Sequence, residues 1–261
     1  MPETRIDEID DGIFRLHTAV ASIPGGFSFN QYLVLDDEPL LFHAGPRSLF
    51  AGMRAAASRV LPVDQLRWIA FSHGEDDESG SLASWIAAAP HARPVCSRIA
   101  AMVGNADVGR QPREMNDGNA DVGRQPREMN DGNADVGRQP RAMADGETLA
   151  IGRRRLRWLD APHVPHGWDC GYMFDETSRT LFCGDLFTQG GLGDAACVET
   201  DILGPSEAMR AQLDYYAHGP NTRPTLEKVA ATAPRLLACM HGSAWRGDGA
   251  ALIRQLAASL G

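Results

Sequence analysis

Residues 66–80 read LRWIAFSHGEDDESG, an apolar run that leads directly into a cluster of metal-binding side chains. The apolar run is typical of a buried strand, so the cluster follows the strand's C-terminal end, where α/β folds usually carry their chemistry. The cluster contains one imidazole and three spaced carboxylates, from His73, Glu75, Asp77 and Glu78. A solvated acidic loop is the simpler interpretation of a charge run. The histidine at the strand exit favours a metal site.

Three further segments downstream carry residues of the same kind. APHVPHGWD at 161–169 supplies a histidine, while TLFCGD at 180–185 and LLACMHG at 236–242 are apolar runs that end in an aspartate and a histidine. Short runs of this type, bounded by Gly or Pro, predict strands. The predicted metal ligands are therefore His73, Glu75, Asp77, Glu78, His166, Asp185 and His241. This set is large enough for two metal ions bridged by Asp185.

As an ordered set, these motifs resemble the metallo-β-lactamase superfamily, and specifically the diiron domain of flavodiiron proteins and the stand-alone oxygen-binding diiron proteins. Zinc hydrolases of the superfamily carry His-x-His-x-Asp-His, and the diiron branch has glutamate at the second position, as Glu75 is here. The 19-residue spacing from His166 to Asp185 (185 − 166) also agrees. The resemblance covers about residues 10–104 and 147–260. One departure is Glu78, which stands where the family has a histidine.

The ligand types favour iron. Carboxylates shift preference from zinc towards harder, higher-coordinate ions. Four carboxylates carry a formal charge of −4, which balances two divalent ions, and unbalanced buried charge is costly. We therefore expect two iron ions, with zinc or manganese as the alternatives. No glycine-rich phosphate-binding fingerprint is present, so no flavin is expected in this chain. A second conformation, with Glu78 pointing outward, would leave one metal under-coordinated.

Other histidines compete for roles near this site. His163 lies nearer the position used by zinc hydrolases and His166 nearer the diiron one. His166 is therefore predicted to be the ligand, and His163 is predicted either to contact a ligand from outside the metal's coordination sphere or to line the pocket. Asp169 is a candidate to orient an imidazole through its other nitrogen. His43 ends an apolar run and is expected at the rim of the site. Aromatic residues close to motif ends that are candidates to line the pocket are Phe27, Phe29, Phe187 and Trp245.

The chain is expected to form one α/β (α+β) domain over residues 1–261. Periodicity supports a mixed layer structure, and the resemblance implies a four-layer αββα sandwich. The predicted strands are 13–20, 31–36, 39–43, 67–72, 148–151, 154–159, 170–175, 180–184 and 235–240. The predicted helices are 47–59, 81–89, 205–217, 223–232 and 248–259.

A tandem repeat interrupts this pattern. The 14 residues NADVGRQPREMNDG at 105–118 recur identically at 119–132, and a third copy at 133–146 differs only at Ala142 and Ala144. One apolar residue in seven is too few for a coiled-coil seam. We interpret 105–146 as a surface insertion of short helical turns, tolerated because loop closure costs little more with length. A neutral expansion and a contact that mediates assembly both remain open.

Composition limits the remaining classes of function. The 261 residues include 43% hydrophobic residues and carry a net charge of −9, which argues against binding of nucleic acid. Five cysteines without a CxxC pair predict free thiols in a reducing compartment. The charged N-terminus predicts no export signal, and no apolar run is long enough to cross a membrane. A cytoplasmic homo-oligomer, a dimer or tetramer, is expected.

The resemblance implies binding of dioxygen or nitric oxide at paired ferrous ions. The protein would be a sensor or carrier, or a reductase supplied by a separate electron donor. The alternative is a dinuclear metallo-hydrolase, in which a metal-bridging hydroxide attacks an ester, lactone or thioester. A third hypothesis is a metal-binding scaffold assembled through the repeat. Whether the protein is an enzyme stays open at this point.

Overall fold

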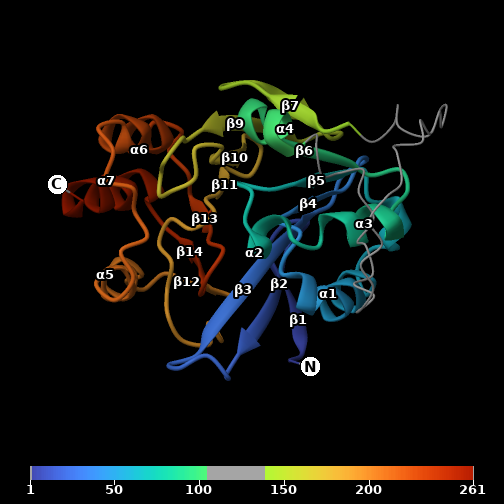
Figure 1. Cartoon of the computed structure of the whole chain (residues 1–261), viewed down its shortest axis with the longest axis horizontal. Coiled ribbons are helices and arrows are strands. Elements are labelled where there is room, and N and C mark those ends of the chain that lie inside the picture. The colour runs from blue at the N-terminus through green and yellow to red at the C-terminus, as the bar shows by residue number, and fades with distance from the viewer. Residues whose placement is uncertain (1, 105–138, 261) are drawn as a thin grey trace, which may run out of the picture.

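Residues 2–104 and 139–260 are described by a computed structural model of the chain. Two seven-stranded sheets face each other and are flanked by helices on their outer sides (Figure 1). Helices α1 and α3 lie on one side, and α5, α6 and α7 lie on the other (Figure 1). The predicted α/β class and the four-layer αββα sandwich are confirmed.

The first sheet has the order β1-β2-β3-β4-β5-β6-β7. Its first four strands pair antiparallel, and the rest pair parallel. The change to parallel pairing begins at β5, so the loop that follows β5 lies at the same edge as the ends of β4 and β6. The strands are β1 (Thr4–Asp10), β2 (Ile13–Val20), β3 (Phe27–Val34), β4 (Leu40–Phe42), β5 (Trp68–Ala70), β6 (Arg93–Ser97) and β7 (Arg141–Met143).

The second sheet has the order β12-β14-β13-β11-β10-β9-β8. Its strands β11 and β13 pair parallel, so the residues that follow them emerge side by side. The strands are β8 (Thr148–Ala150), β9 (Arg155–Asp160), β10 (Gly171–Asp175), β11 (Thr180–Phe182), β12 (Cys197–Val198), β13 (Leu236–Ala238) and β14 (Ala244–Arg246).

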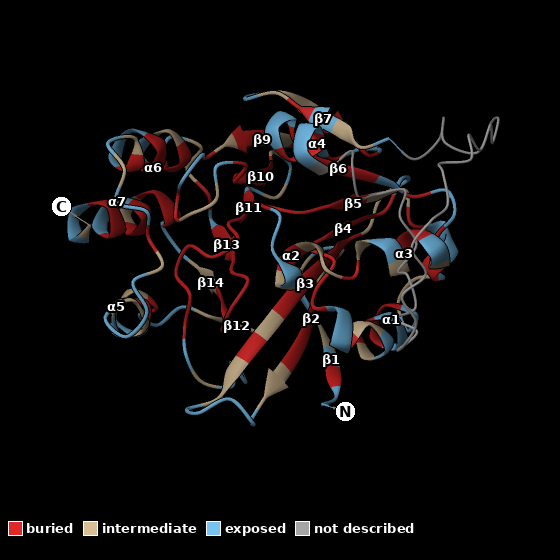
Figure 2. Ribbon diagram, viewed as in Figure 1, coloured by how far each residue is buried: buried red, intermediate tan, exposed pale blue. Residues whose placement is uncertain are grey.

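Three apolar clusters hold the four layers together. One lies between the sheets and includes Tyr32, Phe42 and Phe182. The others pack the outer face of each sheet against its helices, around Trp85 on one side and Ile253 on the other. The strands are largely buried, whereas the helices keep an exposed face (Figure 2). The helices are η1 (Arg47–Leu49), α1 (Phe50–Ala57), η2 (Val63–Gln65), α2 (Asp76–Ser79), α3 (Leu82–Ala88), α4 (Arg98–Gly104), α5 (Leu203–Arg210), α6 (Thr222–Ala230) and α7 (Gly249–Ser259).

Several element boundaries differ from the predicted ones. Strand β3 begins at Phe27 rather than residue 31, and α5 ends at Arg210 rather than residue 217. Strands β1, β6, β7, β12 and β14 were not predicted, because they are short or polar and gain their stability from pairing with neighbours. None of the helices in residues 2–104 and 139–260 has both the length and the hydropathy to cross a membrane.

The end of the third repeat copy belongs to the sheet, which corrects the predicted insertion boundary at 146. Residues Arg141–Met143 form β7 and pair parallel with β6. Met143 is fully buried in the cluster between the sheets. Burial of this methionine and the gain of a strand pairing outweigh the helical turns expected here. The repeat from 105 to 138 lies outside the described residues.

Candidate metal centre

All seven predicted ligands meet at one edge of the two sheets. Asp77 and Glu78 lie in the short helix α2, and the other five lie just beyond a strand end or in a short loop. The parallel pairs β4/β5 and β11/β13 bring their C-terminal ends to this edge. The first sheet contributes His73 and the short helix α2, and the second sheet contributes the loop after β9 and the ends of β11 and β13. The residues brought together are His73, Glu75, Asp77, Glu78, His166, Asp185 and His241.

One half of the cluster is rich in nitrogen and contains His73, His166 and Glu75. The two Nε2 atoms are 3.1 Å apart, and Glu75 Oε1 lies 3.7 Å from His73 Nε2 and 3.3 Å from His166 Nε2. Asp185 Oδ2 completes the group at 3.5 Å from His73 and 3.4 Å from His166. Ligands about 2.1 Å from one tetrahedral ion are about 3.4 Å apart. The donor spacing therefore fits a single metal ion.

The other half is rich in oxygen and contains His241, Asp77 and Glu78. His241 Nε2 lies 3.5 Å from Asp77 Oδ2 and 3.2 Å from Asp185 Oδ1. Oxygens of Asp77 and Glu78 and a nitrogen of His241 lie within 4.8 Å of one another. Asp185 thus turns one carboxylate oxygen to each half. A carboxylate in this position can bridge two ions.

Glu78 is buried without a partner. The side chain is 0% exposed, and neither carboxylate oxygen accepts a hydrogen bond from the described residues. Burial, and then the charge of Asp185, raise the pKa of the Glu78 carboxyl well above its usual range. An isolated buried carboxylate is very costly. A cation or a proton is required here, and the donor set around it fits a cation.

Each imidazole of the cluster is oriented by a hydrogen bond at its Nδ1 atom, on the side of the ring away from the cluster. His166 Nδ1 lies 2.8 Å from the carbonyl oxygen of Tyr215, and His241 Nδ1 lies 2.8 Å from that of Ser28. Carbonyl oxygens only accept, so both Nδ1 atoms carry the proton and both Nε2 atoms face the cluster. His73 Nδ1 lies 3.0 Å from Ser72 Oγ. Such outer hydrogen bonds are typical of metal-binding histidines.

The prediction that Asp169 orients an imidazole is wrong. Its Oδ2 accepts a hydrogen bond of 2.9 Å from the backbone N–H of Gly74, not from an imidazole. The three imidazoles already use Ser72, Tyr215 O and Ser28 O. Asp169 therefore fixes the loop that begins at His73 and acts on the cluster through the backbone.

His43 lies behind the cluster and not at its rim. It is fully buried, and its Nε2 is 3.0 Å from Ser72 Oγ. Burial lowers the pKa of His43 to about 3, so the ring is neutral. A neutral His43 Nε2 can accept the Ser72 hydroxyl proton, which leaves Ser72 Oγ free to accept from His73 Nδ1. His43 and Ser72 together favour the tautomer of His73 that presents a lone pair at Nε2.

Of the residues predicted to line the pocket, Phe27 and Phe29 contact a predicted ligand, whereas His163 is exposed and Phe187 is buried. His163 is exposed, and its backbone N–H donates to the carbonyl oxygen of Gly167. Phe27 and Phe29 pack on the His241 ring, with centroids 4.4 and 5.5 Å away. Phe187 is fully buried. The aromatic wall next to the cluster is therefore formed by β3.

The charges of the cluster are mutually compensating. Burial disfavours a charged His166, but its hydrogen bond with Glu75 and the charge of Asp185 outweigh this and raise the pKa of His166 to about 9. Burial also opposes charge on Asp185, yet the hydrogen bond and charge of His241 hold the pKa of Asp185 well below its usual range. The pocket thus stabilises positive charge, because four carboxylates converge on it.

A buried arginine that was not predicted supports the His241 end of the site. Arg15 is fully buried and donates to the carbonyl oxygens of Gly193, Ala195 and Gly242. Its Nε donates to Asn30 Oδ1 at 2.9 Å. Asn30 Nδ2 in turn donates to the carbonyl oxygen of Gly242. The only sequence signal was one arginine within an apolar strand.

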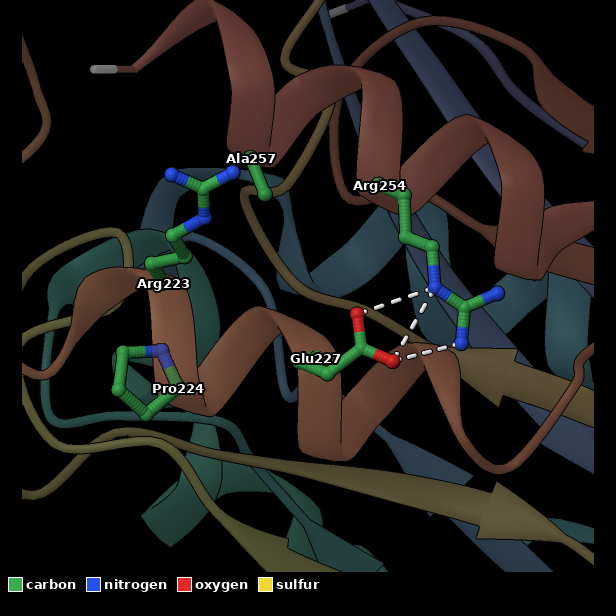
Figure 3. Close-up of a pocket in the computed structure, with 5 residues that line it drawn as sticks. All are labelled: Arg223, Pro224, Glu227, Arg254 and Ala257. Atoms are coloured by element: carbon green, nitrogen blue, oxygen red, sulfur yellow. Dashed lines mark hydrogen bonds and ion pairs between the residues drawn. The ribbon is translucent and has the colours of Figure 1, made fainter.

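A separate hollow lies on the outer helical layer. It measures about 370 Å³ and is formed by α6 and α7 (Figure 3). Arg254 and Glu227 pair across it at 2.6 Å, so the charge of Arg254 is already compensated (Figure 3). The hollow shares no residue with the acidic cluster. It is lined by Arg223, Pro224, Glu227, Arg254 and Ala257.

The metallo-beta-lactamase superfamily is the class that this fold and site define, and its sequence model matches residues 24–258. The chain belongs to this superfamily. No curated protein is matched by the sequence.

Solved structures of flavodiiron proteins share the fold. Rubredoxin oxygen:oxidoreductase from Desulfovibrio gigas aligns with a TM-score of 0.76 and 18% identity, over 98% of this chain and 61% of that one. A variant of the flavo di-iron protein from Thermotoga maritima gives 0.79 and 19%, over 100% and 63%. The flavodiiron protein from Giardia intestinalis gives 0.73 and 17%, over 98% and 59%. The chain spans about three fifths of the length of these proteins.

Proposed function

We propose that the protein holds two iron ions in the acidic cluster and binds dioxygen or nitric oxide there. The observation that carries the proposal is the position of Asp185, whose Oδ2 faces the His73–His166 half and whose Oδ1 faces His241. Two donor groups that share one carboxylate favour a dinuclear site over a single ion. Four carboxylates also balance two divalent ions in charge.

The role of each residue follows from its position. The three imidazoles present Nε2 lone pairs, and Glu75, Asp77 and Glu78 supply charge from the first sheet. Paired ferrous ions supply redox-active centres that a small diatomic molecule can reach together. Phe27 and Phe29 line the His241 side with apolar surface, which suits an uncharged diatomic ligand. Turnover would need a separate electron donor, and we expect the chain to work as a homo-oligomer.

Metal analysis and absorption spectroscopy test the proposal directly. Protein purified from unsupplemented cells is expected to contain two irons per chain, with a visible absorption band that dithionite bleaches and dioxygen or nitric oxide alters. A colourless protein with two zincs that cleaves a chromogenic ester or thioester would overturn the proposal and favour the hydrolase.

Two histidines of one loop provide a matched pair of variants. His166 faces the cluster, whereas His163 is exposed. His166→Ala is expected to lose at least one iron per chain, and His163→Ala is expected to retain both. Equal losses in the two variants would contradict the assignment. Glu75→His is expected to shift metal content from iron towards zinc.

A further inference from the structure

The two halves of the cluster differ in chemistry. The first half has two imidazoles, His73 and His166, and one carboxylate of its own, Glu75. The second half has one imidazole, His241, and two carboxylates, Asp77 and Glu78, of which Glu78 also lies near His73. Asp185 contributes one oxygen to each. The first half therefore offers two nitrogens and two oxygens, and the second offers one nitrogen and at least three oxygens.

Glu78 creates this difference, and its main chain holds it in place. Its carbonyl oxygen accepts a hydrogen bond of 2.6 Å from the N–H of Ala44. Just downstream, Ser81 donates to the carbonyl oxygens of Gly45 and Pro46. These bonds tie the C-terminal end of α2 and the residues just after it to the loop after β4. The Glu78 side chain is consequently directed inward, and its Oε2 lies 3.9 Å from His73 Nε2.

Among the described residues, no lysine or arginine forms an ion pair with the Glu78 carboxylate, and the nearest imidazole nitrogen is His73 Nε2 at 3.9 Å. The two carboxylate oxygens lack hydrogen-bond donors among residues 2–104 and 139–260, and the groups that act on Glu78 by charge are Asp185, Asp77 and Glu75. A fully buried carboxylate beside other carboxylates requires a proton or a bound cation, and the oxygen donors around Glu78 fit a cation. An ion in the second half would be bound mainly by oxygen.

We infer that the two halves select different divalent ions, and that Glu78 sets the difference. The first half takes Fe²⁺, which imidazole ligands suit, and the second half takes Mn²⁺, which oxygen ligands suit. Every nitrogen donor favours Fe²⁺ over Mn²⁺, so Fe²⁺ fills the half with two imidazoles first. This inference rests on the proposed dinuclear function, and it predicts a mixed pair in place of the iron pair when the two ions compete in equal amounts.

Metal competition on the full chain tests the inference without any measurement of activity. Metal-free protein is mixed anaerobically with one equivalent each of Fe²⁺ and Mn²⁺, desalted and measured for both metals, and the manganese is examined by electron paramagnetic resonance. The expected result is about one iron and one manganese per chain, with the manganese signal altered by a neighbouring paramagnetic iron. Two populations of like pairs, or no preference between the halves, would overturn the inference.

Variants at Glu78 assign the effect to this residue. Glu78→His is expected to lower the manganese-to-iron ratio about tenfold or more, because it gives the second half a second imidazole. Glu78→Gln keeps the side-chain shape, removes the charge, and is expected to retain the first ion while it loses the second. Glu199→His, at an exposed position, is the control and should keep the parent ratio. A ratio unchanged in Glu78→His would overturn the inference.

The two proposals fail in different ways. Protein that binds no iron, manganese or zinc stoichiometrically would refute the dinuclear site itself. Protein that binds two ions per chain without discrimination would refute only the difference between the halves.

Discussion

Arg15 donates a hydrogen bond from Nη2 to the carbonyl oxygen of Gly242, over 3.1 Å, at the residue that follows His241. The guanidinium is fully buried, and each of its hydrogen-bond partners is neutral. A buried cation therefore anchors the main chain beside a candidate ligand. Its desolvation is offset by several charge-assisted hydrogen bonds, which are stronger than neutral ones.

Removal of this cation is expected to destabilise the protein. Arg15→Leu leaves the carbonyl oxygens of Gly193 and Ala195 without this donor and removes one of the two donors to Gly242 O, and each buried unsatisfied group costs about 1–3 kcal/mol. We expect a loss of about 3 kcal/mol or more in the free energy of unfolding, measured with urea. Arg59→Leu, at an exposed position after α1, should change it by less than about 0.5 kcal/mol. Equal effects would mean that Arg15 is not an anchor.

His17 is expected to make stability fall in acid. Burial, and then the charge of Arg15, lower the pKa of His17 from 6.5 to about 4. Between pH 6.5 and 4 the unfolded chain binds a proton that the folded chain does not, so stability decreases as pH falls through this window. The difference amounts to at most about 3 kcal/mol. Urea unfolding of the metal-free protein across this range measures it.

In the variant His17→Gln, the free energy of unfolding should fall less between pH 6.5 and 4, because the group that titrates in this range has been removed. The exposed residue His91 provides the control, and His91→Gln should keep the parent's dependence on pH. A parent whose stability is constant from pH 6.5 to 4 would contradict the assignment.

Ser72 is expected to tune metal affinity. Its Oγ lies 3.0 Å from both His73 Nδ1 and His43 Nε2. Ser72→Ala removes the acceptor that orients His73, and loss of such an outer partner typically weakens metal binding by about 10–100-fold. Chelator competition measures the change. Ser58→Ala, which removes an exposed hydroxyl bonded to Arg54 O, should bind metal as the parent does.

Gly171 is expected to tolerate no side chain. A Cβ at this position would lie 2.2 Å from Cζ2 of Trp158, which is fully buried between the sheets. Gly171→Ala must displace the indole, and overpacking of this kind costs about 1–3 kcal/mol or more. The thermal midpoint should drop clearly. Gly190→Ala, where the nearest atom is Met209 Sδ at 3.7 Å, should leave it nearly unchanged.

Several parts of the site were predictable because their signals are local. His73, Asp185 and His241 each follow an apolar run, and a buried strand must release its chain at the sheet edge. Parallel strands release their chains at the same edge, so these residues were expected to meet. The sequence predicted Glu78 as a ligand but did not decide between its inward and outward directions, because the inward direction depends on the hydrogen bond from Ala44, far away in the chain.

The amino-acid sequence by itself determined the kinds and order of the donor groups, the class of fold and the positions of the main strands. These depend on hydrophobic periodicity and on residue chemistry, which neighbouring residues set. The tertiary structure alone decided the division of the cluster into two unlike halves, the burial of His43 and Arg15, and the place of Met143 in the core. Burial and charge compensation depend on contacts between distant segments, and no local pattern encodes those contacts.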